Sequence, residues 1–413
     1  MSQRTALFPR RTALRLAAAA LCLAIGAAQA ADPGVSDKTI KIGVSAPLTG
    51  PVAAVGAVSE GIKLRIAAAN AAGGVKMGDG KTRTIELVVQ DDGIDPQRTL
   101  TNVRKMVEQG EAFALVGISG TPNNQAIGRY VEQNKVPNLF MYSGVQELPE
   151  GPNWMIGLVP SFTTEAAAFA EHLKASRADA KVAVLFLNTE TGQTFKAAFA
   201  NAIKGSRIQL VAEQPVTPVD PTIDTQMSNL KASGADTLVI IAPPKQGAQA
   251  VKFAAESGWR PMTMLSYIAS SVAALKPAGL ANAKGLVTSQ FIKPVDSPAF
   301  ADDAGVQRYL ADYASAKPRF DKTDSQGQVG YVTGEALVRV LEAMREPTRQ
   351  AMMDAARNMN KVAIGLLLPG ITLTTKGQAD PYPIESLQLM RFDGENYQAV
   401  GAVMSFEGKT PKH

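Results

Sequence analysis

The chain has 413 residues, of which 46% are hydrophobic and 19% are charged, a composition typical of a folded protein with more than one domain. Its net charge of +5 comes mostly from four arginines in the first thirty residues, where there is no acidic residue. Beyond that segment, 38 basic side chains face 37 acidic ones. This balance excludes a strongly basic surface, and we expect no nucleic-acid partner.

The first thirty residues predict a signal peptide. Arg10, Arg11 and Arg15 precede the apolar run Leu16 to Ala28, and Ala28-Gln29-Ala30 has the small residues of a cleavage site. The run is shorter than the roughly 20 residues of a membrane-spanning helix, so we expect cleavage after Ala30 and export to the periplasm. The paired arginines leave open whether export follows the general or the twin-arginine route.

The only cysteine, Cys22, lies in this leader. The mature chain is therefore expected to have no disulfide, no thiolate metal ligand and no thiol nucleophile. Leu21 stands where a lipoprotein signal needs a small residue, so we expect no lipid anchor. No later segment contains eighteen consecutive apolar residues, and we expect no membrane-spanning helix after the leader.

Short β-type runs alternate with helical stretches from Thr39 onward, which is typical of parallel α/β proteins. Asp95-Pro96 supplies an N-cap and a first-turn residue for one of the helices. The first half contains predicted strands at 39–47, 85–89, 113–116 and 137–141, and predicted helices at 53–70, 95–110 and 122–134. Together these elements predict one doubly wound lobe.

The alternation starts again after Pro160 and predicts a second lobe of the same design. Its predicted strands are 182–187, 208–216, 237–242, 262–266 and 285–291, and its helices are 163–175, 194–204, 223–232 and 246–257. Helices at 305–316 and 326–345 follow, and a hairpin of 386–392 and 397–405 turns at Asp393-Gly394. The predicted fold class is α/β, with two Rossmann-like lobes of parallel sheet.

Side chains that carry out catalysis are scarce. The two histidines are His172 and His413. We interpret His172 as a solvated residue on the surface of a helix. The chain has no G-x-S-x-G, Walker A or G-x-G-x-x-G motif. Asp91-Asp92 could act as a carboxylate pair, but we interpret both as residues that cap a loop. We therefore expect no enzymatic activity, no cofactor and no metal.

Two small-residue loops indicate a binding site. Ser119-Gly120-Thr121 follows the strand 113–116 and enters a helix, and Tyr142-Ser143-Gly144 follows the next strand. Glycine permits close approach of the backbone, hydroxyls can donate hydrogen bonds, and free N–H groups at a helix start favour an anion. Simple N-capping of the helix by Ser119, Thr121 or Asn123 explains the first loop equally well. The second loop favours a site, because ligands bind at the carboxyl ends of parallel strands.

With these residues in view, the chain resembles the type I periplasmic solute-binding proteins of ABC importers, in particular the branched-chain amino acid (leucine-binding) group. No single motif carries the resemblance, but the order and spacing of several do. They are Ile40-Lys41-Ile42-Gly43-Val44 with Pro47-Leu48-Thr49-Gly50-Pro51, Asn70 to Gly74, Asp91-Asp92 with Asp95-Pro96, Gly120-Thr121-Pro122 with Val136-Pro137, Ser233-Gly234-Ala235-Asp236, and Leu389-Met390-Arg391-Phe392-Asp393-Gly394.

The resemblance implies two Rossmann-like lobes joined by a three-stranded hinge, which close on a small solute and present it to an inner-membrane ABC permease. It places the crossovers near Pro160, Thr288 and Pro369. Lobe one would comprise 38–159 and 291–366, and lobe two 160–290 and 367–410. Such proteins are mostly monomers, and we expect a monomer here.

The resemblance also implies the site. The first lobe would grip a ligand carboxylate through Ser119, Gly120 and Thr121 and through Tyr142, Ser143 and Gly144. The second lobe would close with side chains from three strand exits. These are Glu190 and Thr191 within Asn188 to Gln193, Pro243 within Ala242 to Lys245, and Ser266 and Tyr267 within Ser266 to Ser270.

Two departures from the family pattern concern the ligand. Amino-acid binders place an acid on the second lobe to pair the ligand ammonium, but Leu265 to Ser270 contains none and only Glu190 lies nearby. Thr191 and Val55 replace aromatic residues. We therefore expect a small carboxylate with an apolar or aromatic body, with a branched-chain amino acid as the alternative. Tyr267 is expected either as a wall of the pocket or as ordinary core.

Two other functions fit parts of this pattern. The same fold serves as a ligand-sensing subunit for a signalling partner, and a neighbouring permease and ATPase would distinguish the importer from the sensor. An exported two-domain hydrolase would require turnover that depends on Asp91 or Asp92, and the scarcity of histidine and cysteine disfavours it.

Overall fold

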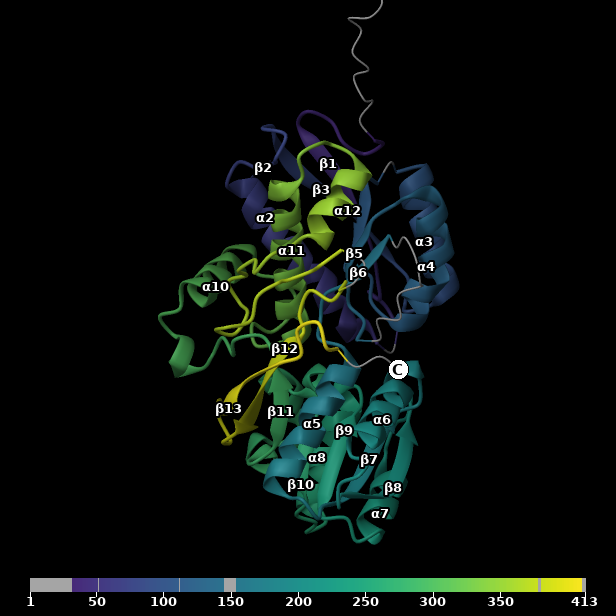
Figure 1. Ribbon diagram of the computed structural model, residues 1–413, viewed down its shortest axis with the longest axis vertical. Helices are drawn as coiled ribbons and strands as arrows, with labels where there is room; N and C mark the ends of the chain where they lie inside the picture. Colours follow the sequence, from purple (N-terminus) through teal and green to yellow (C-terminus); the bar gives the residue numbers. More distant parts are fainter. Residues whose placement is uncertain (1–31, 51, 111, 145–153, 378–379, 411–413) are drawn as a thin grey trace, which may run out of the picture.

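The computed structural model describes residues 32–50, 52–110, 112–144, 154–377 and 380–410. The predicted signal peptide lies outside them. Figure 1 shows two β-sheets, one above the other along the long axis of the molecule, each with its own helices. We call the upper unit the first lobe and the lower unit the second lobe. The predicted two-lobed α/β architecture is confirmed. Within the described ranges, no helix has the length and hydropathy needed to span a membrane.

The first lobe contains a six-stranded sheet in the order β2-β3-β1-β4-β5-β6. Its strands are β1 (Thr39–Ala46), β2 (Val75–Lys76), β3 (Thr82–Asp91), β4 (Ala114–Val116), β5 (Asn138–Met141) and β6 (Met155–Gly157). All neighbours are parallel except β2 and β3. Every residue of β4 and β5 is buried, as expected where helices cover both faces of a parallel sheet.

Helix α11 completes the first lobe from far along the chain. The helices of this lobe are α2 (Ala57–Ala71), α3 (Pro96–Glu108), α4 (Thr121–Asn134), α10 (Ala304–Ala316), α11 (Ser325–Ala343) and α12 (Arg349–Arg357). A Cβ on Gly61 of α2 would lie 2.0 Å from the carbonyl oxygen of Gly327, and one on Gly330 would lie 2.0 Å from that of Val58. The backbones of α2 and α11 therefore touch, which only glycine permits at these positions.

The second lobe contains a seven-stranded sheet in the order β13-β12-β11-β10-β9-β7-β8. Its strands are β7 (Lys181–Leu187), β8 (Gln209–Val216), β9 (Thr237–Ile241), β10 (Met262–Leu265), β11 (Val287–Gln290), β12 (Ser386–Phe392) and β13 (Tyr397–Ser405). Its helices are α5 (Phe162–Ser176), α6 (Glu190–Ala202), α7 (Asp224–Ala232), α8 (Pro244–Glu256) and α9 (Val272–Leu275). The strands β12 and β13 form the predicted antiparallel hairpin.

The chain passes between the lobes three times: between β6 and α5, after β11, and before β12. The second and third passages pair with each other, because Leu368 N donates to Phe291 O at 2.9 Å and Lys293 N donates to Leu366 O at 2.8 Å. One cluster of buried apolar side chains runs from the first lobe through Val159, Phe291 and Leu367 into the second. The three passages, which together form the hinge, are therefore part of the hydrophobic core.

A few local predictions differ from the structure. The predicted helix 53–70 starts with a 3-10 turn at Ala53–Gly56, and β2 and β6 were not predicted because they are only two and three residues long. His172 is only partly solvated: its side chain is partly buried, and its buried Nε2 has no hydrogen-bond partner among the described residues. Burial, followed by the charge of Arg391, lowers its pKa.

Candidate functional site

A cavity of about 330 Å³ lies between the two lobes. Its walls are formed mainly where strands end, in the loops after β1, β3, β4 and β5 of the first lobe and after β7, β8, β9 and β10 of the second. This is the edge at which ligands bind in parallel α/β sheets. The lining residues are Val52, Val55, Ile94, Gly120, Thr121, Pro122, Asn123, Tyr142, Ser143, Gly144, Val159, Phe162, Leu187, Thr189, Thr191, Pro218, Pro243, Pro244, Tyr267, Ile268 and Gln326.

Helix α4 begins at this cavity, and no side chain in the described part of the protein caps its first turn. Its N-cap residue, Gly120, has φ of 91°, a left-handed conformation that suits glycine. Asn123 Nδ2 donates instead to Thr99 Oγ1 at 2.6 Å, and the Thr121 hydroxyl pairs with that of Ser143. The interpretation of this loop as simple N-capping is therefore wrong. The uncapped N–H groups and the positive end of the helix dipole favour an anion at this wall.

The two predicted hydroxyl loops lie side by side, because β4 and β5 are neighbours in the sheet. Gly120 N donates to Tyr142 O at 3.1 Å, and Thr121 Oγ1 lies 2.7 Å from Ser143 Oγ. Gly144, with these four residues, lines the cavity. The structure therefore brings together five of the six first-lobe residues that the sequence predicts, next to the start of α4.

Three predicted contacts do not line the cavity. Ser119 is 1% exposed, and its hydroxyl has no hydrogen-bond partner in the part of the chain that the structure describes. Ser266 turns away from the cavity, because its Oγ donates to Glu165 Oε2 at 2.6 Å. Glu190 accepts hydrogen bonds from Gln125 and also lies outside the lining. Contact of these three residues with a ligand stays a prediction.

The second-lobe wall is mostly apolar and contains no charged side chain among the described residues. Thr191, Pro243 and Tyr267 line it as predicted, together with Leu187 and Ile268. No Asp, Glu, Lys, Arg or His belongs to the described lining of either lobe. A ligand ammonium in this cavity would lack a counter-charge, and an unpaired buried charge costs several kcal/mol, roughly. A carboxylate, in contrast, would meet the start of α4.

Tyr267 is both core and cavity wall. It is 6% exposed, and its hydroxyl donates to Pro160 O at 3.1 Å. Its ring stacks on that of Phe162 at 5.9 Å between centroids and forms a T-shaped pair with that of Phe291 at 5.5 Å. Burial raises the pKa of Tyr267 well above its ordinary value, so the side chain stays neutral. The two expectations for this residue are thus compatible, and the tyrosine connects the cavity wall to the passages between the lobes.

Glu165, a buried acid that sequence reasoning missed, lies behind this wall. Its carboxylate accepts hydrogen bonds from Ser266 Oγ at 2.6 Å, Ser289 Oγ at 2.6 Å and Tyr267 N at 2.8 Å. Burial raises its pKa to about 7, although the three donors act in the opposite direction. A signal existed in the sequence: Glu165 lies three residues after Phe162 and four before Phe169, on the apolar face of α5.

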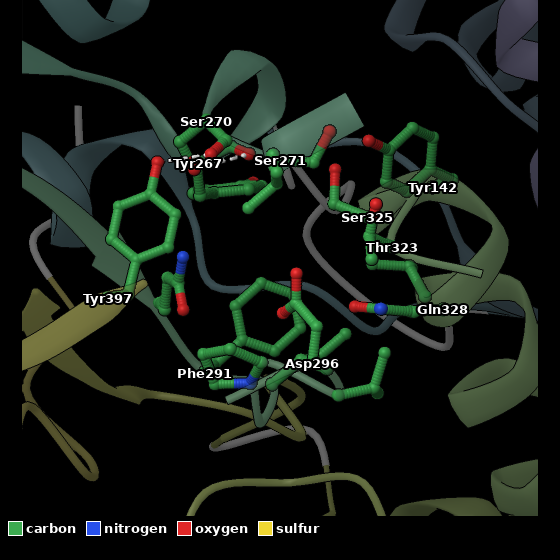
Figure 2. Close-up of a pocket in the computed structure, with 16 residues that line it drawn as sticks. Tyr142, Tyr267, Ser270, Ser271, Phe291, Asp296, Thr323, Ser325, Gln328 and Tyr397 are labelled. Carbon is green, nitrogen blue, oxygen red and sulfur yellow. Dashed lines mark hydrogen bonds between the residues drawn. The ribbon is translucent and has the colours of Figure 1, made fainter. Parts of the chain in front are cut away.

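A second, smaller cavity of about 50 Å³ lies on the hinge side of Tyr142 and Tyr267. Figure 2 shows that the side chains of Ser325, Gln328 and Asp296 surround it. Tyr397 of the second lobe also lines this cavity, and its hydroxyl donates to the backbone oxygen of Ser270. The space suits a few water molecules but is too small for an amino acid or an aromatic acid. The larger cavity is therefore the candidate ligand site.

The carboxylates of Asp91 and Asp92 hold loops together, as predicted. Asp91 accepts from Leu48 N and Gly93 N at 2.8 and 3.1 Å, and hydrogen bonds led by that of the Thr49 hydroxyl lower its pKa to about 2. Asp92 accepts from Ser45 Oγ at 2.7 Å. Neither residue lines the cavity. Both are structural acceptors.

Thr189, Pro244 and Ile268 line the cavity within the three second-lobe segments that the resemblance implies. The lining residues that were not predicted include Val52, Ile94, Phe162, Leu187, Pro218 and Gln326. Four of these six lie at or shortly after the end of a predicted strand, so the rule that ligands bind at strand exits could have found them. Phe162 and Gln326 differ, because they belong to the first turns of α5 and α11. Only the arrangement of the lobes brings those helix starts to the cavity.

Two lobes of parallel sheet, joined by three passages and enclosing a cavity without a charged side chain in its described lining, define a two-lobed solute-binding protein. The sequence profile of the periplasmic binding protein family matches residues 39–396, and the chain belongs to this family. The predicted family is thereby confirmed.

Comparison with known proteins agrees with this family assignment. The Leu/Ile/Val-binding protein homolog 3 of Brucella melitensis is 30% identical over 231 residues, 54% of this chain and 58% of that protein, so the match spans less than two thirds of this relative. A branched chain amino acid ABC transporter from Thermus thermophilus with bound valine has a TM-score of 0.80 at 16% identity, covering 90% of this chain and 97% of that one. A solute binding protein of an R. palustris ABC transporter, in complex with 4-hydroxybenzoate, has a TM-score of 0.73 at 17% identity, covering 89% and 97%. At these identities the two structures show the fold.

Proposed function

We propose that this chain is the periplasmic substrate-binding component of an ABC importer and captures a small carboxylate with an apolar or aromatic body. The charge distribution of the large cavity carries the proposal: an uncapped helix start and two hydroxyls on one wall, apolar side chains on the other, and no charged group in the described lining. The relatives named above support the transport role, and of the two structural neighbours one has bound valine and the other is in complex with 4-hydroxybenzoate.

The mechanism follows from the hinge. A ligand whose carboxylate binds near Thr121 and Ser143, and whose body packs against Ile268 and Tyr267, touches both lobes and stabilises the closed arrangement. The permease would then recognise the closed form. This proposal includes export with cleavage after Ala30, a monomer, and the lobe boundaries 38–159 with 291–366 and 160–290 with 367–410.

Calorimetry on the secreted chain tests the ligand class. We expect benzoate-type acids to bind with a dissociation constant of ~0.1 to 10 μM. The corresponding amides should bind at least about tenfold more weakly, because they lack the charge that the start of α4 stabilises. Leucine should bind weakly, because its ammonium has no partner. Micromolar binding of leucine without binding of any simple acid would refute the ligand class while leaving the transport role intact.

A further inference from the structure

Three carboxylates converge where the third passage between the lobes meets the segment after β13. Asp380, Glu385 and Glu407 each offer an oxygen, and these oxygens lie within 4.8 Å of one another. Asp380 and Glu385 are 6% and 2% exposed, and Glu407 is partly buried. Three such carboxylates repel one another unless a cation or protons neutralise them.

Two oxygens of this cluster are buried and have no hydrogen-bond partner among the residues that the structure describes: Asp380 Oδ2 and Glu407 Oε1. Both carboxylate oxygens of Glu385, in contrast, accept hydrogen bonds from the segment after β13. Its Oε2 accepts from Gly408 N at 2.8 Å, and its Oε1 accepts from Thr410 N at 3.2 Å. A buried acceptor without a partner is costly, and here two of them lie in one cluster of acids.

The described part of the chain supplies no basic partner to the cluster. None of its ion pairs includes Asp380, Glu385 or Glu407. Lys361 and Lys376 face Glu407, but both are exposed and neither forms an ion pair with it.

We propose that Asp380, Glu385 and Glu407 bind one hard divalent cation of the calcium class. The ligands are carboxylate oxygens only, which suits Ca²⁺ and disfavours the softer transition metals. Ca²⁺ takes six to eight oxygen ligands, roughly, in flexible geometry, so three carboxylates and water satisfy it, whereas Mg²⁺ requires a near-ideal octahedron. The site is separate from the solute cavity and does not depend on the ligand class proposed above.

Such a cation would link the segment after β13 to the third passage between the lobes. Asp380 and Glu385 precede β12, and Glu407 follows β13. Thr410, which bonds to Glu385, also lies 3.4 Å from Thr164 at the start of α5, measured between the Oγ1 atoms. The cation therefore joins the third passage to the segment after β13, next to the end of the first passage, and we expect its binding to stabilise the fold.

The test uses the secreted chain, freed of metal with a chelator and titrated with CaCl₂ by calorimetry. We expect one Ca²⁺ per chain with a dissociation constant at or below about 1 mM, and a rise in Tm of at least about 2 °C at saturation. Asp380→Asn and Glu407→Gln should each weaken Ca²⁺ binding at least about tenfold and should reduce the rise in Tm. Glu395→Gln removes an exposed carboxylate at the hairpin turn and should bind Ca²⁺ as the unmodified chain does.

Two results would overturn the site. One is the absence of Ca²⁺ binding up to about 10 mM, which would mean that protons or a side-chain cation neutralise the cluster. The other is Ca²⁺ binding that survives in both variants, which would place the cation elsewhere. Glu407→Gln is the safer variant for folding, because Glu407 is only partly buried. Solute binding, measured by calorimetry on the same samples, tests the proposed function separately from the cation site.

Discussion

Gln125 of α4 donates its Nε2 to both carboxylate oxygens of Glu190 on α6, at 3.0 and 3.1 Å. These helices belong to different lobes, so the bond closes the cleft beside the cavity. A second bond between the lobes joins Lys276 to Asp321 at 3.0 Å. We infer that this bond between Gln125 and Glu190 favours the closed arrangement of the lobes.

Glu190→Ala should therefore weaken solute binding about two- to fivefold, the effect of losing one exposed hydrogen bond between the lobes. Glu190→Gln keeps an acceptor for Gln125 and should bind nearly as well as the unmodified chain. Calorimetry with the tightest-binding acid measures both. Equal affinity of the alanine variant and the unmodified chain would show that this bond does not contribute to closure.

Thr121→Val keeps the shape of the side chain and removes one hydroxyl of the 2.7 Å pair with Ser143. We expect the affinity for a carboxylate solute to fall about ten- to a hundredfold, because hydrogen bonds to charged groups contribute about 1.5–3 kcal/mol. Thr101→Val on α3 removes a hydroxyl that bonds only within its own helix and serves as the control. If both variants bind acids alike, the hydroxyl pair is not part of the site.

Gly144→Ala tests the contact between the second hydroxyl loop and α5. A Cβ on Gly144 would lie 2.6 Å from a ring carbon of Phe162, and this ring stacks on Tyr267. We expect a loss of about 1–3 kcal/mol in the free energy of unfolding, together with weaker solute binding.

The matched control for this change is Gly128→Ala in α4, where the nearest atom would be Met155 Sδ at an ordinary 3.6 Å. This substitution should leave stability unchanged or raise it by up to about 1 kcal/mol, since alanine favours helix. Urea unfolding measures both variants. A Gly144→Ala protein as stable as the control would mean that Phe162 moves aside freely.

The buried Glu165 makes stability depend on pH. Its pKa is raised to about 7 in the folded protein, from an ordinary 4.5, so the folded chain holds a proton that the unfolded chain releases. The stabilisation is complete below about pH 4.5 and is lost as the pH rises to about 7, a change of about 3 kcal/mol. Glu165→Gln cannot titrate, so its free energy of unfolding should fall less between pH 5 and 8. Parallel pH profiles of the two proteins would contradict this.

The sequence was sufficient for the features that depend on local pattern. The N-cap of α3 is Asp95, followed by Pro96 as the first helical residue, as predicted. The loops around Thr121 and Ser143 meet because neighbouring parallel strands end at the same edge of a sheet. Such predictions need only the order of the strands and the chemistry of the residues after them.

Features that depend on contacts between distant segments could not be predicted. Ser266 was expected in the cavity. Its hydroxyl instead donates a hydrogen bond to Glu165, which lies 101 residues earlier in the chain. The pairing of Gln125 with Glu190 depends on how far the lobes close. The cluster of Asp380 with Glu407 requires the hairpin to bring both ends together, which neither spacing nor residue type reveals.

The contact of α2 with α11 through Gly61 and Gly330 has a consequence for biosynthesis. Residues 57–71 leave the ribosome long before residues 325–343, so the first lobe cannot acquire its covering helix while the earlier part of the chain is being made. We expect cotranslational folding of this lobe to be postponed until nearly the whole polypeptide has been synthesised. The nascent protein would thus remain open during the period in which the proposed export requires translocation.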